Sequence, residues 1–202
     1  MFIYKFCFGS DSDKNAAFLT DEECSMDLMR EITVMTTTAY RYNLYGSIED
    51  FDYYLAFFAN MATYGENDAV VLYINSPGGS IDVGLSIISS INACQAPVTA
   101  IVEAPSFSMA SVIALACDNL VFMENTYLMF HNYSIGHSGK GAEFMLNTAH
   151  NDEHINRVFV MHCSPFLTKA ELKRIRNDGD VYIKDSDDTL SKRMERHFKP
   201  RK

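Results

Sequence analysis

The sequence predicts an α/β fold made of alternating strand and helix units. Short apolar runs without interruption, such as residues 69–74, are typical of strands buried on both faces of a sheet. They alternate with segments whose apolar residues recur every three or four positions, the period of a helix that packs on a sheet. This alternation favours parallel βα units over an all-helical or all-strand fold.

The first expected elements lie between residues 42 and 74. Residues 42–46 form a short strand-like run, and apolar residues between 51 and 61 recur at helical spacing. Ser47 before Glu49 is a plausible start for this helix, because acidic side chains stabilise the first turn. Residues 69–74 form the next expected strand.

The same alternation continues along the chain. Further helices are expected over residues 81–91, 108–117 and 141–163, the last unusually long for a small domain. Further strands are expected over residues 98–102, 120–123 and 127–130. Residues 1–40 have no clear period and are rich in Ser, Thr, Asp and Glu, so we expect an irregular arm there. One domain is then expected over residues 41–202.

Composition and charge exclude several functional classes. The chain has 202 residues, of which 48% are hydrophobic and 21% charged, which suits one folded domain rather than a disordered chain. Its net charge of −9 disfavours nucleic acid as a partner, because phosphate binding needs a positive face. No apolar stretch reaches the roughly 18 residues of a membrane span. The five cysteines form no CxxC, so we expect buried thiols in a cytoplasmic protein.

Two turns that follow expected strands carry groups suited to nucleophilic catalysis. In residues 75–80, Gly78 and Gly79 permit a positive φ and leave N–H groups that can hold an oxyanion, although such glycines often serve turn geometry alone. In residues 104–111, Ser108 lies at a strand-to-helix junction, as a nucleophile elbow requires, but without a GxSxG pattern. A serine there is more often a helix N-cap. Ser106 and Ser111 are competing candidates.

A third strand end offers a base. His131 ends the expected strand 127–130, where it could act as general base for a nearby serine or could be a core histidine bonded to backbone. Asp178 and Asp180 could orient the imidazole as the third member of a Ser-His-Asp set. Most acidic clusters are only solvated, so both assignments depend on the fold.

Three runs closely resemble the proteolytic subunit of the Clp protease, a self-compartmentalised serine peptidase. They are YINSPGG at residues 73–79, SM at 108–109 and MFH at 129–131. The likeness extends over about residues 42–183. It implies a spiral of βα units, a fold shared with crotonases, with the helix at 141–163 as a protruding handle. It also implies a serine endopeptidase that cleaves unfolded polypeptides or short peptides without metal or cofactor.

The resemblance also assigns roles to particular residues. It makes Ser108 the nucleophile and His131 the base, with the N–H groups of Gly79 and Met109 as the oxyanion hole. In the family the triad aspartate directly precedes a short strand with an aromatic residue, which favours Asp180 over Asp178. The substrate-binding positions that it implies, where an extended peptide would pair by strand addition, are Gly78, Ser80, Ile81, Asn132 and Tyr133.

Partners follow from the same resemblance. It implies one heptameric ring or two stacked rings, which act with a hexameric AAA+ unfoldase. The chain has no GxxxxGK[ST] and so lacks a P-loop of its own for ATP hydrolysis. The family's Gln-Pro after the histidine is Asn132-Tyr133 here, and its glycine before the Ser-Met region is replaced. These departures suit a divergent bacterial, organellar or phage-encoded member, acting in the host cytoplasm in the last case.

Three alternatives stay open. One is a catalytically inactive subunit that only builds rings, which an intact triad would argue against. Another is a crotonase-type acyl-CoA enzyme, which does not need a Ser-His-Asp set. The third is a metallopeptidase, because His150, Glu153 and His154 match HxxEH on an expected helix. That pattern arises readily by chance and needs a further ligand downstream.

Overall fold

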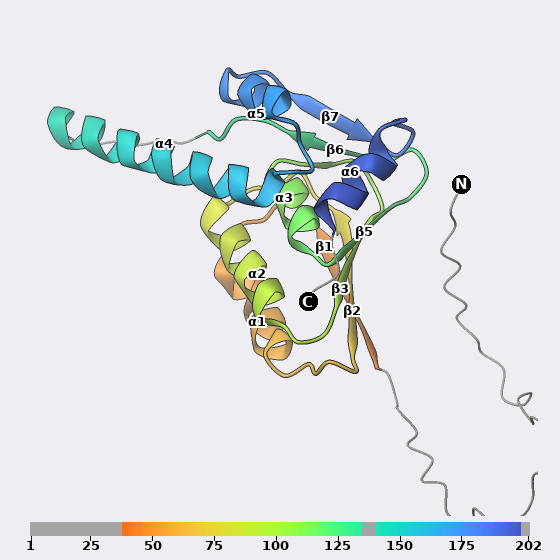
Figure 1. Ribbon diagram of the computed structural model, residues 1–202. Coiled ribbons are helices and arrows are strands. Elements are labelled where there is room, and N and C mark those ends of the chain that lie inside the picture. The colour runs from red at the N-terminus through yellow and green to blue at the C-terminus, as the bar shows by residue number, and fades with distance from the viewer. Residues whose placement is uncertain (1–37, 135–139, 199–202) are drawn as a thin grey trace, which may run out of the picture. The chain divides into compact units, whose positions relative to one another are not determined.

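A four-stranded parallel sheet forms the base of the described structure (Figure 1). The strand order is β1-β2-β3-β5. The bounds of these strands are Ala39–Tyr45 for β1, Ala69–Asn75 for β2, Val98–Val102 for β3 and Asn119–Phe122 for β5. Because the strands are parallel, the carboxyl ends of β2 and β3 open onto the same edge, where the turns after both strands meet.

The computed structural model describes residues 38–134 and 140–198, with only the backbone described for residues 141–151. The chain divides into two units, Met1–Met35 and Thr36–Lys202, and every described residue belongs to the second. Most of the arm expected over residues 1–40 therefore lies outside the described residues. Its last part does not fit that description, since β1 begins at Ala39.

A second sheet has three strands, which end or begin next to Ser108, His131 and Asp180. It has the order β4-β6-β7, with β4 at Ser106–Phe107, β6 at Tyr127–Phe130 and β7 at Val181–Lys184. Strand β4 runs parallel to β6, and β7 runs antiparallel to it, with Phe130 opposite Val181. This sheet brings residues from three distant parts of the sequence together.

Six α-helices and one 3-10 helix complete the described fold. Their bounds are Phe51–Tyr54 for η1, Leu55–Met61 for α1, Ile81–Ala93 for α2, Met109–Ala116 for α3, Gly141–Cys163 for α4, Lys169–Arg176 for α5 and Leu190–His197 for α6. The expected long helix over 141–163 is confirmed, and in Figure 1 it extends past α2 and α5. Among the described helices, none is both long and apolar enough to cross a membrane. The α/β prediction is confirmed.

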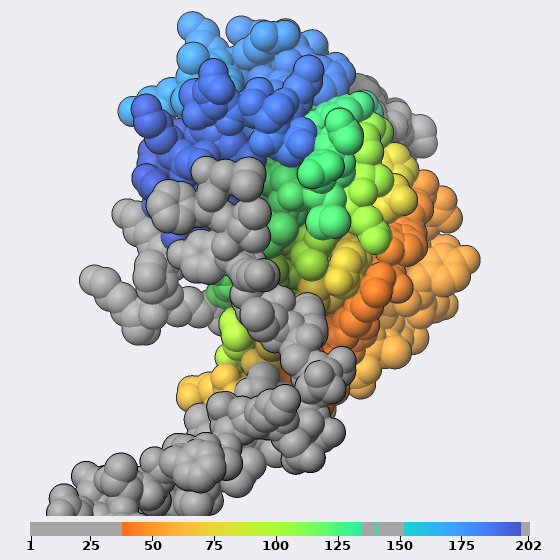
Figure 2. All heavy atoms as spheres, turned by 90° about the vertical axis from the view of Figure 1, so that its right-hand side faces the viewer, coloured from red at the N-terminus to blue at the C-terminus, as the bar shows by residue number. Residues whose placement is uncertain are grey.

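The core lies on one face of the four-stranded sheet. Val70, Leu72 and Ile74 of β2 are at most 3% exposed, whereas Val71 and Tyr73, on the other face, are only half-buried. The prediction that residues 69–74 are buried on both faces is therefore wrong, because no described element covers the second face. In Figure 2 that side shows bands of colour in strand order, from orange through yellow to green.

An ion pair joins α5 and α6. Arg193 is buried and binds both carboxylate oxygens of Glu171, at 2.9 and 2.7 Å. Glu171 also closes a capping box with Thr168 at the start of α5. Burial acts to raise the pKa of Glu171, but the hydrogen bonds from Arg193 and Thr168 outweigh it and lower that pKa to about 2. Glu171 therefore stays ionised, and it ties α5 both to the capping residue Thr168 and to Arg193 of α6.

The described cysteines agree with the expected buried thiols. Cys94, Cys117 and Cys163 are buried and form no disulfide. Burial raises the pKa of the Cys117 and Cys163 thiols, which keeps them protonated and unreactive. Cys7 and Cys24 lie outside the described residues.

Candidate active site

Ser108 occupies a sharp turn between β4 and α3. Its backbone has φ +56° and ψ −126°, a left-handed conformation that is strained for a residue with a side chain. The Ser108 N–H donates to the carbonyl of Met129 at 2.9 Å, which fixes the turn against β6. A strand, a strained serine and a helix in this order form a nucleophile elbow.

The Ser108 hydroxyl is available for chemistry. It makes no capping hydrogen bond to α3, so the expected alternative of an N-cap side chain is not found. The two competing serines differ from Ser108, since the side chains of Ser106 and Ser111 are fully buried. The Ser106 hydroxyl donates to the carbonyl of Ala104 at 3.1 Å, and that of Ser111 donates to the carbonyl of Met129 at 2.9 Å. Both hydroxyls support the turn that presents Ser108.

Gly78 allows the turn after β2 to pack directly against Ser108. It has φ +89°, and a Cβ added there would lie 2.7 Å from the Ser108 Cβ and 2.9 Å from the Met109 nitrogen. Contacts below 3.0 Å are sterically forbidden, so only glycine fits. The absence of a side chain at Gly78 brings the backbone of this turn next to the start of α3.

Two backbone N–H groups at this junction are unused. Neither the Gly79 N–H nor the Met109 N–H donates to an acceptor within the described part of the chain, and both residues line the same cavity. Gly79 is held in place by a parallel bridge to Ile48, whose N–H donates to the carbonyl of Gly78 at 2.9 Å. Free N–H groups beside an uncapped hydroxyl are an arrangement that can stabilise an oxyanion.

The substrate-binding positions expected after Gly79 differ from one another. The Ser80 N–H donates to the carbonyl of Ile48 at 2.7 Å, and the Ser80 carbonyl accepts from the Gly84 N–H at 3.0 Å. Ser80 therefore has no free backbone group with which to pair a peptide, and its side chain caps α2. Ile81, by contrast, lines the cavity.

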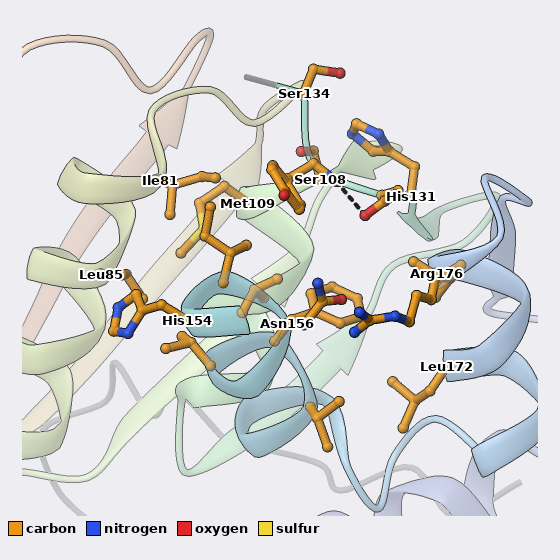
Figure 3. Close-up of a pocket in the computed structure, with 18 of the residues that line it drawn as sticks. Ile81, Leu85, Ser108, Met109, His131, Ser134, His154, Asn156, Leu172 and Arg176 are labelled. Carbon is orange, nitrogen blue, oxygen red and sulfur yellow. Dashed lines mark hydrogen bonds between the residues drawn. The ribbon is translucent and has the colours of Figure 1, made fainter. Parts of the chain in front are cut away.

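His131 follows the last residue of β6 and faces the same cavity as Ser108. Figure 3 shows Ser108, Met109 and His131 at one end of this cavity and Leu172 at the other. Within the described ranges, His131 makes no hydrogen bond, so it is neither bonded to backbone nor to Ser108. Catalytic hydrogen bonds are often loose before substrate binds, and both side chains line the same cavity.

The register of β6 and β7 separates the two candidate aspartates. The last paired residues are Phe130 and Val181, and continuing this register by one step would bring Asp180 opposite His131. Asp180 accepts a hydrogen bond from the Tyr182 hydroxyl at 3.4 Å. Asp178 has φ +60° and accepts from the Asn132 side chain at 2.9 Å. Neither aspartate is hydrogen-bonded to His131.

The cavity beside Ser108 has a volume of about 470 Å³. Its apolar walls come from α2, α3, α4 and α5, and the residues are Leu85, Val112, Ile155, Val158, Phe159, Leu172 and Ile175. Asn132 and Tyr133, which were expected at the substrate site, also line it. The contribution of α5 was not predicted from the sequence, although the Thr168–Glu171 capping box marks the start of that helix.

The HxxEH pattern leads to no described metal site. The side chain of His150 lies outside the described residues, and Glu153 and His154 are exposed on α4. Over the side chains that the structure describes, no group of three or more His, Cys, Asp or Glu could hold a metal ion. His154 instead lines the cavity.

Comparison with known proteins identifies the family of this chain. The model of the Clp protease family matches residues 26–184. The chain is 36% identical over 83 residues to the ATP-dependent Clp protease proteolytic subunit of Ligilactobacillus salivarius (strain UCC118), which is 40% of this chain and 42% of that protein. It is 35% identical over 97 residues to the protein of the same name from Streptococcus equi subsp. equi (strain 4047), which is 43% of this chain and 49% of that protein.

A shorter and more similar match links the chain to Leuconostoc citreum (strain KM20). There the ATP-dependent Clp protease proteolytic subunit is 51% identical over 45 residues, or 22% of each chain. Each of these matches spans less than half the length of the curated relative. The family model, however, spans most of this chain. The chain belongs to the Clp protease family.

Proposed function

We propose that this protein is a serine peptidase in which Ser108 is the nucleophile and His131 the general base. The observation that carries the proposal is the strained backbone of Ser108 at a strand–helix junction, with its hydroxyl uncapped beside two unused N–H groups. Such strain persists only where the surrounding structure enforces it, and it gathers at catalytic sites. His131 faces the same cavity.

The mechanism that we propose follows from these positions. His131 takes the proton of the Ser108 hydroxyl as Oγ attacks the carbonyl carbon of a peptide. The N–H groups of Gly79 and Met109 hold the oxyanion of the tetrahedral intermediate. The C–N bond then breaks, His131 gives its proton to the leaving amine, and water hydrolyses the acyl ester on Ser108 by the same steps.

Asp180 is the proposed partner of His131. Side chains directly opposite in an antiparallel pair have Cβ atoms about 5 Å apart, close enough for a carboxylate to reach an imidazole. We expect Asp180→Asn to lower kcat by about 10³-fold or more, because the imidazolium would lose its counter-charge. Asp178→Asn keeps an acceptor for Asn132 and should lower kcat by less than about tenfold. Steady-state kinetics on a fluorogenic peptide compares the two variants, and equal losses would reject this assignment.

The substrate class follows from the cavity. Its apolar walls suit the apolar side chain that precedes the cleaved bond, while the backbone near Asn132 would pair with an extended peptide. By likeness to the Clp proteolytic subunits, we propose heptameric rings, one or two stacked, that receive unfolded polypeptides from a hexameric AAA+ ATPase.

A fluorophosphonate probe tests this function on the full chain. We expect one adduct by intact mass, located on Ser108 by peptide mapping, because only an activated serine reacts with such probes. The second candidate function is an inactive ring subunit, which the missing hydrogen bond between Ser108 and His131 favours. An assembled ring that takes up no probe, alone or with an unfoldase present, would support that candidate and reject the peptidase.

A further inference from the structure

The carboxylate of one residue on α4, Asp152, binds three polar residues that line the cavity. The Tyr133 hydroxyl donates to Oδ1 at 3.0 Å, and the Asn156 side chain donates to the same oxygen at 2.8 Å. The Arg176 guanidinium donates to Oδ2 at 3.1 Å. These donors come from the segment after β6, from α4 and from the last turn of α5. Asp152 therefore joins three walls of the cavity without lining it.

A second contact ties the same segment to the turn before Asp180. The Asn132 side chain donates to Asp178 at 2.9 Å. The turn itself is fixed to the end of α5, since the Asp178 N–H donates to the carbonyl of Ile175 at 3.0 Å. The two residues that follow His131 are thus held on one side by Asp178 and on the other by Asp152.

The contribution of Asp152 comes from hydrogen-bond geometry more than from charge. Its side chain is 41% exposed and that of Arg176 is 59% exposed, and ion pairs this exposed contribute little to stability. The contact with the Tyr133 hydroxyl is not an ion pair, since burial and the hydrogen bond to Asp152 both raise the pKa of this hydroxyl. The hydroxyl therefore stays protonated and donates to Asp152, which fixes the direction of the Tyr133 side chain.

We propose that Asp152 is a positioning residue for the proposed active site. It holds residues 132–133 against α4 and α5, so that His131 stays opposite Asp180 and the cavity keeps its walls. This inference rests on the proposed role of His131 as the general base. A shift of about 1 Å in such a group is enough to lower a rate by up to about 100-fold.

Hydrogen exchange on the full chain tests the structural half of the inference. The Tyr133 amide donates to the Asn132 side chain at 3.0 Å. In Asp152→Ala this amide should exchange about tenfold faster, and Tyr133→Phe should reproduce part of this increase. Asp152→Asn keeps an oxygen that accepts from Tyr133 and should retain most of the protection. The matched control is Glu153→Gln, which removes the neighbouring charge on α4 from an exposed side chain. Unchanged exchange in Asp152→Ala would overturn the inference.

Fluorophosphonate labelling and peptide kinetics test the catalytic half. We expect Asp152→Ala to lower kcat and the labelling rate about tenfold, because His131 loses its alignment with Asp180. Asp152→Asn should restore most of the rate, which a merely destabilised chain would not explain. Faster exchange with an unchanged labelling rate would overturn the link to His131. A wild-type chain that never labels would reject the peptidase, while the exchange data would still decide whether Asp152 holds the segment.

Discussion

Replacing Ser108 by alanine is expected to abolish peptide hydrolysis, with a loss in kcat of about 10⁴-fold or more. The proposed acyl ester forms on the Ser108 Oγ, and the other two serines of this turn are fully buried with their hydroxyls already bonded. No described hydroxyl in the turn can therefore take over. Hydrolysis of a fluorogenic peptide measures the loss.

The Ser108→Ala protein should fold and assemble as the wild type does. Alanine keeps the Cβ and hence the backbone strain, and the lost hydroxyl makes no capping bond. Ser89→Ala is the matched control, because Ser89 is exposed on α2 and away from the cavity. Hydrolysis above about a hundredth of the wild-type rate in Ser108→Ala would rule out this nucleophile.

Gly78→Ala is expected to lower kcat/KM at least about 100-fold, although the Ser108 hydroxyl itself is retained. The new Cβ would lie 2.7 Å from the Phe107 carbonyl oxygen and 2.7 Å from the Ser108 Cβ. The carbonyl belongs to the backbone of β4, so the turn has to move and take the Gly79 N–H away from its proposed place in the oxyanion hole. The positive φ of Gly78 adds to the strain, and we expect a loss of about 2 kcal/mol in the free energy of unfolding.

Gly65→Ala provides the control for this prediction. An alanine Cβ at Gly65 would meet only the Asp68 carboxylate, at an ordinary distance of 3.9 Å. Denaturant unfolding and peptide kinetics on both variants separate the two effects. If Gly78→Ala were as active as Gly65→Ala, the close approach of this turn to Ser108 would have no role in catalysis.

The fold was predictable where the sequence carries strong local patterns. The bounds expected for β3, β6 and α4 match those of the structure, because each element is a distinct apolar run or a long segment with helical spacing. Strand β4 is only two residues long and has no period to read. Helices α5 and α6 are rich in charged residues, and the Glu171–Arg193 pair that joins them is a contact between residues distant in sequence.

Part of the candidate site was predictable for the same reason. The turn glycines and Ser108 lie in the turns after the expected strands 69–74 and 98–102, which are parallel neighbours, so these two turns were expected at one edge of a sheet. His131 follows the expected strand 127–130, which belongs to the second sheet. The link between Asp152 and the cavity could not be predicted, because Tyr133, Asn156 and Arg176 come together only once α4 and α5 have packed. The burial of only one sheet face was missed because an apolar run does not reveal what covers it.

The strained backbone at Ser108 also bears on what natural selection retains at this position. Glycine would adopt φ +56° with little strain, and we estimate that it would make the folded state about 1 kcal/mol more stable. A subunit that served only as a building block would gain from that exchange and lose nothing. Serine in this conformation is a disadvantage for folding, and the proposed catalytic use of its hydroxyl would offset that disadvantage.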